Sequence, residues 1–182
     1  MNIAFTRQAL VGVVLLLLLG GGVFLSRSSW RRYFDNSDPR EELLEANFRK
    51  HESEFQDLLT MSQTDRKLVR IANDFTWLDT NAAWPRPESE WGISRERWDQ
   101  YRGLFKTLGV PGGMLRENKG TVTYFIVFSG GLVTNGFSKG YAYSDTEPAP
   151  LVSSLDDPAS WPKGNRVVFK HLKGDWYLFC MS

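Results

Sequence analysis

The chain is poor in the residues that form disulfides and metal centres. Its 182 residues include one cysteine, Cys180, and two histidines, His51 and His171. One cysteine excludes an intramolecular disulfide, and these three residues are too few for a four-ligand zinc site of the usual cysteine and histidine kind. We therefore expect no metal and no cofactor.

The chain also lacks a surplus of charge of either sign. It has 22 basic and 21 acidic residues, which give a formal net charge of +1. Proteins that bind nucleic acid usually gather lysine and arginine on one patch or stripe, whereas here they are scattered along the sequence. We expect no nucleic-acid partner. The length predicts one globular domain with accessory segments.

No complete catalytic motif is present. The stretch "GGLVTNGFSKG" has Phe137 where a phosphate-binding loop needs lysine, and "HESEF" has Phe55 where a zinc-protease motif needs its second histidine. Alternation along the last strand places Cys180 among apolar residues, so we expect a buried thiol and not a nucleophile activated by His171. The sequence therefore predicts no catalytic residue.

One long hydrophobic run is present near the N-terminus. Residues 9–25, "ALVGVVLLLLLGGGVFL", form an uncharged run of 17 residues, which as a helix spans about 25 Å, close to the hydrocarbon thickness of a thin bilayer. The sequence after it lacks a good signal-peptidase site and continues with Arg27, Arg31 and Arg32. We predict an uncleaved transmembrane helix and a lipid bilayer as its partner.

The charges on the two sides of the run favour opposite orientations in the membrane. Arg7 and the terminal amine favour a cytoplasmic N-terminus, whereas the three arginines after the run favour a cytoplasmic C-terminal side. We expect the first arrangement, with an extracytoplasmic globular part. The predicted organisation is an anchor with its flanks at residues 1–32, a linker at 33–38 and one globular domain at 39–182.

The start of this run resembles the N-terminus of type IV prepilins. In "AFTRQALVGVVLLLLL", as in that family, a small residue precedes Phe5-Thr6 and a long hydrophobic helix. The resemblance covers about ten residues, and the chain has Arg7 and Ala9 where the family has leucine and glutamate. It implies a pilin-like assembly subunit with an antiparallel sheet after the helix.

The globular part begins with two predicted helices. Asp38 and Pro39 are typical of a helix start, and an apolar stripe predicts a helix that continues to about Ser62. Residues 64–78 fit either a helix or short strands. A second helix begins after Ser94 as its N-cap and ends at Gly109.

Short runs of strand-forming residues follow from Gly113 onward. They predict strands at 121–129, 137–144 and 166–180, the last being a hairpin that turns at Lys173-Gly174-Asp175. A segment rich in proline, aspartate and serine separates the hairpin from the strand before it. The fold class is therefore α+β: two amphipathic helices packed on one face of an antiparallel β-sheet.

Four tryptophans stand seven residues apart, at Trp77, Trp84, Trp91 and Trp98. Prolines and a glycine between the first three exclude a continuous helix, so the spacing is not a coiled-coil seam. Trp98 belongs to the buried stripe of the second helix. The other three either cover the edge of the core, which we favour, or form an aromatic surface that stacks on sugar or peptide.

The candidate ligand-binding residues are Trp84, Trp91, Lys139 and Tyr141. Lys139 follows a glycine turn and precedes a tyrosine-bearing strand, where it either faces a pocket or, as we favour, protects an edge strand. Our first hypothesis is a membrane-anchored, non-enzymatic binding or assembly domain at the cell envelope, with a protein or glycan partner. The alternative is an envelope hydrolase or glycan-processing enzyme that uses Trp84, Trp91 and either Glu88 or Glu90.

Overall fold

The computed structural model describes residues 38–78, 87–117, 121–130, 136–164 and 166–182. The predicted anchor, the prepilin-like residues, the linker up to residue 37, and Trp84 lie outside these ranges. Residues 38–182 form one compact unit. No helix among the described residues is long and apolar enough to cross a bilayer.

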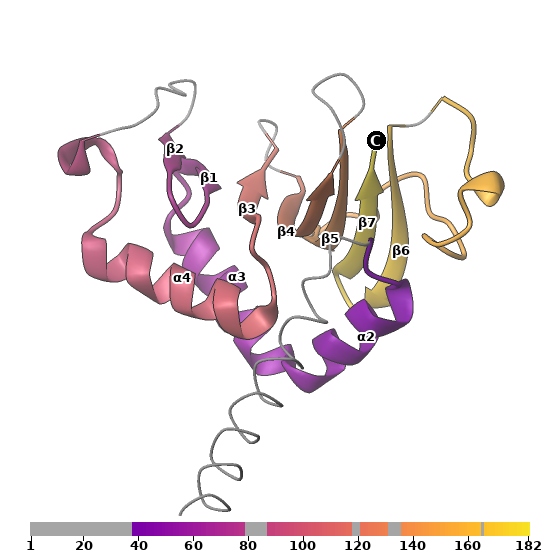
Figure 1. The fold of residues 1–182 in the computed structure, drawn as a ribbon, viewed down its shortest axis with the longest axis horizontal. Coiled ribbons are helices and arrows are strands. Elements are labelled where there is room, and N and C mark those ends of the chain that lie inside the picture. The colour runs from indigo at the N-terminus through magenta and orange to yellow at the C-terminus, as the bar shows by residue number, and fades with distance from the viewer. Residues whose placement is uncertain (1–37, 79–86, 118–120, 131–135, 165) are drawn as a thin grey trace, which may run out of the picture. The chain divides into compact units, whose positions relative to one another are not determined.

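The unit consists of three α-helices and a seven-stranded antiparallel sheet (Figure 1). Its helices are α2 (Glu41–Lys50), α3 (Glu52–Thr64) and α4 (Arg95–Leu108), with 3₁₀ turns η1 (Glu88–Glu90) and η2 (Pro158–Ser160). Its strands are β1 (Leu68–Ile71), β2 (Thr76–Leu78), β3 (Gly113–Arg116), β4 (Thr123–Gly130), β5 (Phe137–Tyr143), β6 (Val167–Lys173) and β7 (Trp176–Met181), in the order β2-β1-β3-β4-β5-β7-β6. The α+β class and the helix–sheet packing are confirmed.

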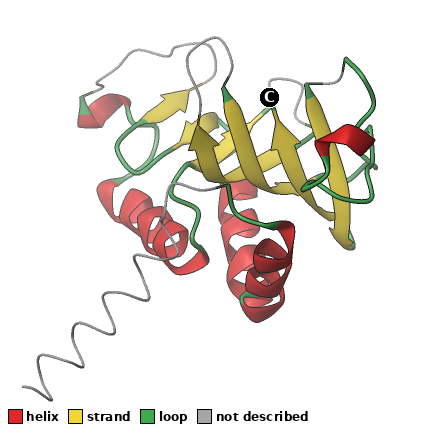
Figure 2. Cartoon of the chain, turned by 45° about the vertical axis from the view of Figure 1, so that its right-hand side comes forward, coloured by secondary structure: helices red, strands yellow, loops and turns green. Residues whose placement is uncertain are grey.

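The three helices lie together on one side of the sheet (Figure 2). A core cluster joins apolar residues of all three helices, among them Phe48, Phe55 and Phe105, to one face of the strands. The opposite face carries a second, smaller cluster that includes Tyr124, Tyr177 and Phe179. Alternate residues of each strand therefore pack into two different apolar layers, as the two-residue period of a strand requires.

The first predicted helix is in fact two helices. His51 leaves the helical conformation, with φ −122° and ψ 30°, and separates α2 from α3. The break redirects the chain so that Phe48 and Phe55, on either side of it, both lie against Trp176 of β7, with ring centroids 5.3 and 5.6 Å away. A straight helix has one direction only, whereas two short helices follow the twisted sheet.

The second predicted helix is confirmed at both ends. The Ser94 side chain accepts a hydrogen bond from the Arg97 amide, and Gly109 ends the helix in the left-handed conformation at φ 65°. Residues 64–78, which the pattern left open, complete α3 at Thr64 and form β1 and β2, an antiparallel pair.

A strap of residues 150–152 lies along the outer side of β6. Phe169 of that strand donates a backbone hydrogen bond to the carbonyl of Pro150 and accepts one from the amide of Val152, at 3.0 and 2.7 Å. Leu151 forms an isolated parallel bridge with Phe169. The strap therefore pairs with backbone groups that would otherwise be free at this edge of the sheet.

Candidate functional site

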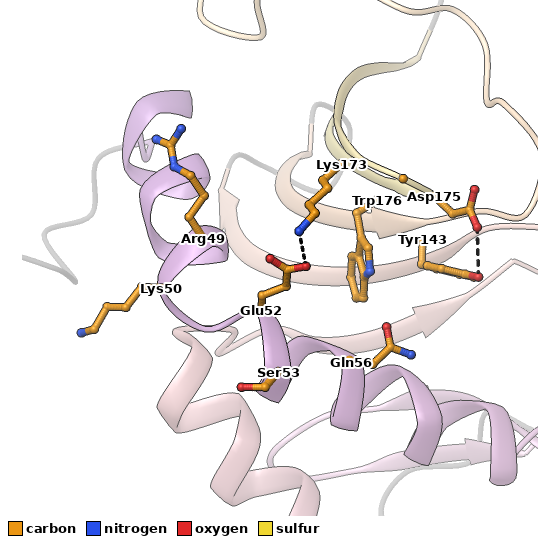
Figure 3. Close-up of a pocket in the computed structure, with 10 residues that line it drawn as sticks. Arg49, Lys50, Glu52, Ser53, Gln56, Tyr143, Lys173, Asp175 and Trp176 are labelled. Carbon is orange, nitrogen blue, oxygen red and sulfur yellow. Dashed lines mark hydrogen bonds and ion pairs between the residues drawn. The ribbon is translucent and has the colours of Figure 1, made fainter.

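An open cleft lies between the α2–α3 junction and the turn that joins β6 to β7 (Figure 3). Its volume is about 720 Å³. It is lined by Arg49, Lys50, Glu52, Ser53, Gln56, Tyr143, Lys173, Gly174, Asp175 and Trp176. The cleft therefore combines an aromatic floor with side chains that donate and accept hydrogen bonds, a mixture typical of small-molecule sites.

Trp176 forms the floor of the cleft and is held rigidly. The side chain is 7% exposed, and its ring lies 5.3–5.6 Å from those of Phe48, Phe55, Phe125 and Tyr143. Aromatic neighbours on several sides leave the indole no room to rotate, because protein interiors are packed as densely as organic crystals. A ligand in the cleft would meet a preformed surface.

Two polar pairs flank the Trp176 ring (Figure 3). Lys173 Nζ donates to Glu52 Oε1 at 2.5 Å, and the Tyr143 hydroxyl donates to Asp175 Oδ2 at 3.4 Å. Burial, aided by hydrogen bonds to Asp145 and Asp175, raises the pKa of Tyr143 to about 12. Its hydroxyl group is therefore protonated at neutral pH and acts as a donor.

The predicted ligand residues on β5 lie inside the domain, away from this cleft. Lys139 is fully buried and forms ion pairs with Asp156, at 2.5 Å, and with Asp38, at 3.3 Å. The Tyr141 hydroxyl donates to the Leu44 carbonyl and accepts from the Asn47 side chain, both at 3.0 Å. Both residues join α2 or the segments beside it to the sheet, and a ligand role for them stays a prediction.

The preferred interpretation of Lys139 as an edge-strand residue is wrong. Strand β5 pairs with β4 on one side and with β7 on the other, so it lies inside the sheet. The sequence offers no signal for the ion pair, because Asp38 and Asp156 are 101 and 17 residues away from Lys139 along the chain.

Trp91 packs against the core at the N-terminal end of α4. Its ring meets the ring of Trp98 edge to face at 4.5 Å, and the guanidinium of Arg95 lies 5.1 Å from its centre. Glu88 is exposed and paired with Arg95. Trp91 therefore extends the core cluster as a half-buried cover, and Trp84, its predicted companion, lies outside the described residues.

Cys180 and His171 lie on opposite faces of the sheet. Cys180 belongs to the core cluster on the helix side, whereas His171 pairs with Tyr177, which belongs to the second cluster. The imidazole contacts the Gly174 carbonyl through Nε2, at 3.0 Å. This placement confirms the buried thiol and removes His171 as its activating base.

We expect Cys180 to react slowly with a thiol-alkylating reagent in the native protein. Burial raises the pKa of its thiol to about 12, an effect that the nearby Lys139 charge only partly offsets, so little thiolate forms at neutral pH. Labelling followed by mass spectrometry at pH 7 should be slow without denaturant and fast in urea. Rapid native labelling would contradict the burial of the thiol.

No group of three or more histidine, cysteine, aspartate or glutamate side chains that could hold a metal ion occurs in the described part of the chain. Comparison with protein-family models, with curated proteins and with solved structures found no match. Any functional assignment must therefore come from the geometry itself. Sequence reasoning missed the residues of the cleft, because it interpreted Lys173 to Asp175 only as a hairpin turn.

Proposed function

We propose that the chain is a single-pass membrane protein whose extracytoplasmic α+β domain binds a hydroxyl-rich ligand of the saccharide class in the cleft over Trp176. The uncharged run at residues 9–25 supports the membrane attachment. The observation that carries the binding role is the rigid indole flanked by two polar pairs. The domain is a binding module and not an enzyme.

The chemistry of the cleft suits sugar hydroxyl groups. A sugar ring offers an apolar face, which packs on an aromatic side chain, and a rim of hydroxyl groups that both donate and accept hydrogen bonds. Glu52 and Asp175 supply acceptors, and Lys173 and Gln56 supply donors, around the part of Trp176 that lines the cleft. In the Lys173–Glu52 pair, two of the charges that line the cleft neutralise each other. The cleft therefore suits an uncharged ligand.

The hydrogen bonds to the carboxylates of the cleft favour binding over hydrolysis. Glu52 accepts from Lys173, and Asp175 accepts from Tyr143, so both carboxylates already have hydrogen-bond donors. Of the residues that the sequence suggested for an enzyme, Glu88 is paired with Arg95 and Trp91 covers the core, and neither lines the cleft over Trp176.

One sedimentation experiment tests both parts of the proposal. Membranes from cells that produce the full chain are washed at alkaline pH and incubated with a panel of fluorescent oligosaccharides. We expect the protein to stay in the pellet, because a transmembrane helix resists this wash, and to retain at least one oligosaccharide. Substitution of Lys173→Ala or Gln56→Ala should reduce that retention about tenfold, the effect of losing one or two hydrogen bonds to the ligand.

Lys163→Ala is the matched control, since Lys163 is an exposed lysine that does not line the cleft. It should leave both sedimentation and oligosaccharide retention unchanged. Release of the protein by the alkaline wash would disprove the anchor. Equal retention of the oligosaccharide by the cleft variants and the wild type, or no retention of any member of the panel, would disprove the assignment of the cleft.

A further inference from the structure

Arg70 on β1 differs from the other arginines that the structure places in or near the core. Its guanidinium is largely buried, and within the described part of the chain its Nη1 atom has no hydrogen-bond partner. Native proteins pair nearly all buried polar groups, and an unpaired buried charge is especially costly. An orphan donor of this kind requires an explanation.

Two other partly buried arginines of the described residues have several hydrogen-bond partners each. Arg116 donates to the carbonyls of Ser62, Arg66 and Leu68. Arg97 donates to the Asp65 carboxylate at 2.8 Å and also to the carbonyl of Met61. The unpaired nitrogen of Arg70 is therefore not a general feature of how this fold buries arginine.

Two aromatic side chains lie beside the Arg70 guanidinium. Its guanidinium lies 5.8 Å from the centre of the Phe75 ring, and the Phe75 and Trp77 rings lie 5.5 Å apart. Arg70 and Trp77 are partners in the register of β1 and β2, so they share a face of the sheet. Both rings are only half-buried, and they form apolar walls beside a cation.

Side chains of α4 hold the backbone of the turn that follows Arg70 and β1. The turn after β1 is held by Trp98, whose Nε1 donates to the Ala72 carbonyl, and by Arg102, whose Nε donates to the Asn73 carbonyl, both at 2.8 Å. Asn73 in turn donates to the Pro111 carbonyl at 3.0 Å. The turn that follows Arg70 is therefore preorganised, as a binding site requires.

We propose that Arg70, Phe75 and Trp77 form a carboxylate-binding site on the face of the β1–β2 hairpin opposite the helices. A free guanidinium nitrogen donates charge-assisted hydrogen bonds to a carboxylate, and aromatic walls exclude the water that would compete. A phosphate dianion fits less well, because it needs several donors. The negative charge of Asp74, which acts on Arg70, also repels a dianion more strongly than a carboxylate with a single charge. This site is distinct from the cleft over Trp176.

The experiment follows the melting temperature of the full chain in detergent micelles, at pH 7 and constant ionic strength, as acetate replaces chloride. We expect a saturable rise for the wild type and none for Arg70→Met. In chloride, Arg70→Met should melt about 2–8 °C above the wild type, because it removes a largely buried charge whose Nη1 atom has no hydrogen-bond partner. Arg70→Lys should respond more weakly than the wild type, because lysine keeps the charge but loses the planar guanidinium that places Nη1.

Arg97→Met is the matched control. Arg97 lies 5.6 Å from the centre of the Tyr101 ring, is already bonded to Asp65 and Met61, and takes no part in the turn after β1. This variant should melt below the wild type and keep the full acetate response. An acetate response retained by Arg70→Met, or a melting temperature of that variant below the wild type, would overturn the proposal.

A second arm identifies the source of the carboxylate. An end-blocked Gly-Asp-Gly peptide is compared with acetate and with its asparagine counterpart. Saturation by the aspartate peptide at about one tenth of the acetate concentration would indicate a protein side chain as the natural partner, and equal concentrations would indicate a small free carboxylate. A response to the asparagine peptide as strong as to the aspartate peptide, or to phosphate alone, would contradict carboxylate recognition.

Discussion

Substitution of Trp98 by alanine should lower the free energy of unfolding by about 3–5 kcal/mol, which is the usual cost of truncating a buried aromatic side chain. Trp98 is 2% exposed and lies among residues from several elements. Its ring contacts the ring of Trp91 and the guanidinium of Arg102, and its Nε1 donates to the Ala72 carbonyl. The alanine variant loses the packing and leaves that buried carbonyl without its partner.

Urea denaturation of the domain measures this effect. Trp98→Phe keeps much of the apolar area but loses the hydrogen bond, so we expect an intermediate cost of about 1–3 kcal/mol. Lys106→Ala, on the exposed side of the same helix, should change stability by about 0.5 kcal/mol or less. A cost below about 1 kcal/mol for Trp98→Ala would contradict the burial of this position.

Asp156→Asn should destabilise the domain by about 3 kcal/mol or more, because it removes the closer partner of a fully buried ammonium group. Lys139 would then keep only Asp38, at 3.3 Å and on a half-exposed side chain. We do not expect a loss of stability when the lysine itself is replaced. Lys139→Met should be neutral or stabilising, since a well-packed apolar side chain of similar size avoids the cost of burying the charge.

The double variant Lys139→Met with Asp156→Asn distinguishes this explanation from a general weakness of the site. It should be clearly more stable than Asp156→Asn alone in the same urea denaturation, because no buried charge is left unpaired. If the change in the free energy of unfolding of the double variant equals the sum of the changes in the two single variants, the ion pair is not the reason for the cost.

The Lys139–Asp156 ion pair also makes the stability of the domain depend on pH. Burial acts to raise the pKa of Asp156, but hydrogen bonds from Lys139 and the Glu41 amide and the Lys139 charge outweigh it and lower the pKa. The contribution of Asp156 is therefore complete above the ordinary carboxyl range and is lost as the pH falls below that range. Unfolding curves from pH 7 to pH 3 should show a smaller loss of stability for Asp156→Asn than for the wild type.

Local patterns in the sequence were sufficient for most of the fold. The N-cap at Ser94, the glycine end at Gly109 and the alternating final hairpin each depend on residues within a few positions of one another. The break at His51 was missed, because nothing in its own helix opposes continuation. It depends instead on the sheet, against which Phe48 and Phe55 pack.

The sites could not be predicted to the same extent, because they depend on contacts between distant parts of the chain. The cleft brings Glu52 next to Lys173, which is 121 residues later. Lys139 was predicted as a ligand-binding or edge-strand lysine, and its ion-pair partners became visible only when the sheet was assembled. Nothing in the residues around Arg70 distinguishes a paired guanidinium from an unpaired one.

The strap beside β6 has a consequence for the membrane-anchored protein that we propose, in which many copies would share one membrane. Confinement to two dimensions raises the frequency of encounters, and sheet edges are the surfaces at which such encounters become irreversible aggregation. Residues 150–152 occupy the β6 edge with a short segment that begins with Pro150, which has no amide hydrogen to offer a neighbouring copy. The strap thereby allows dense crowding of the chain without fibre growth from that edge.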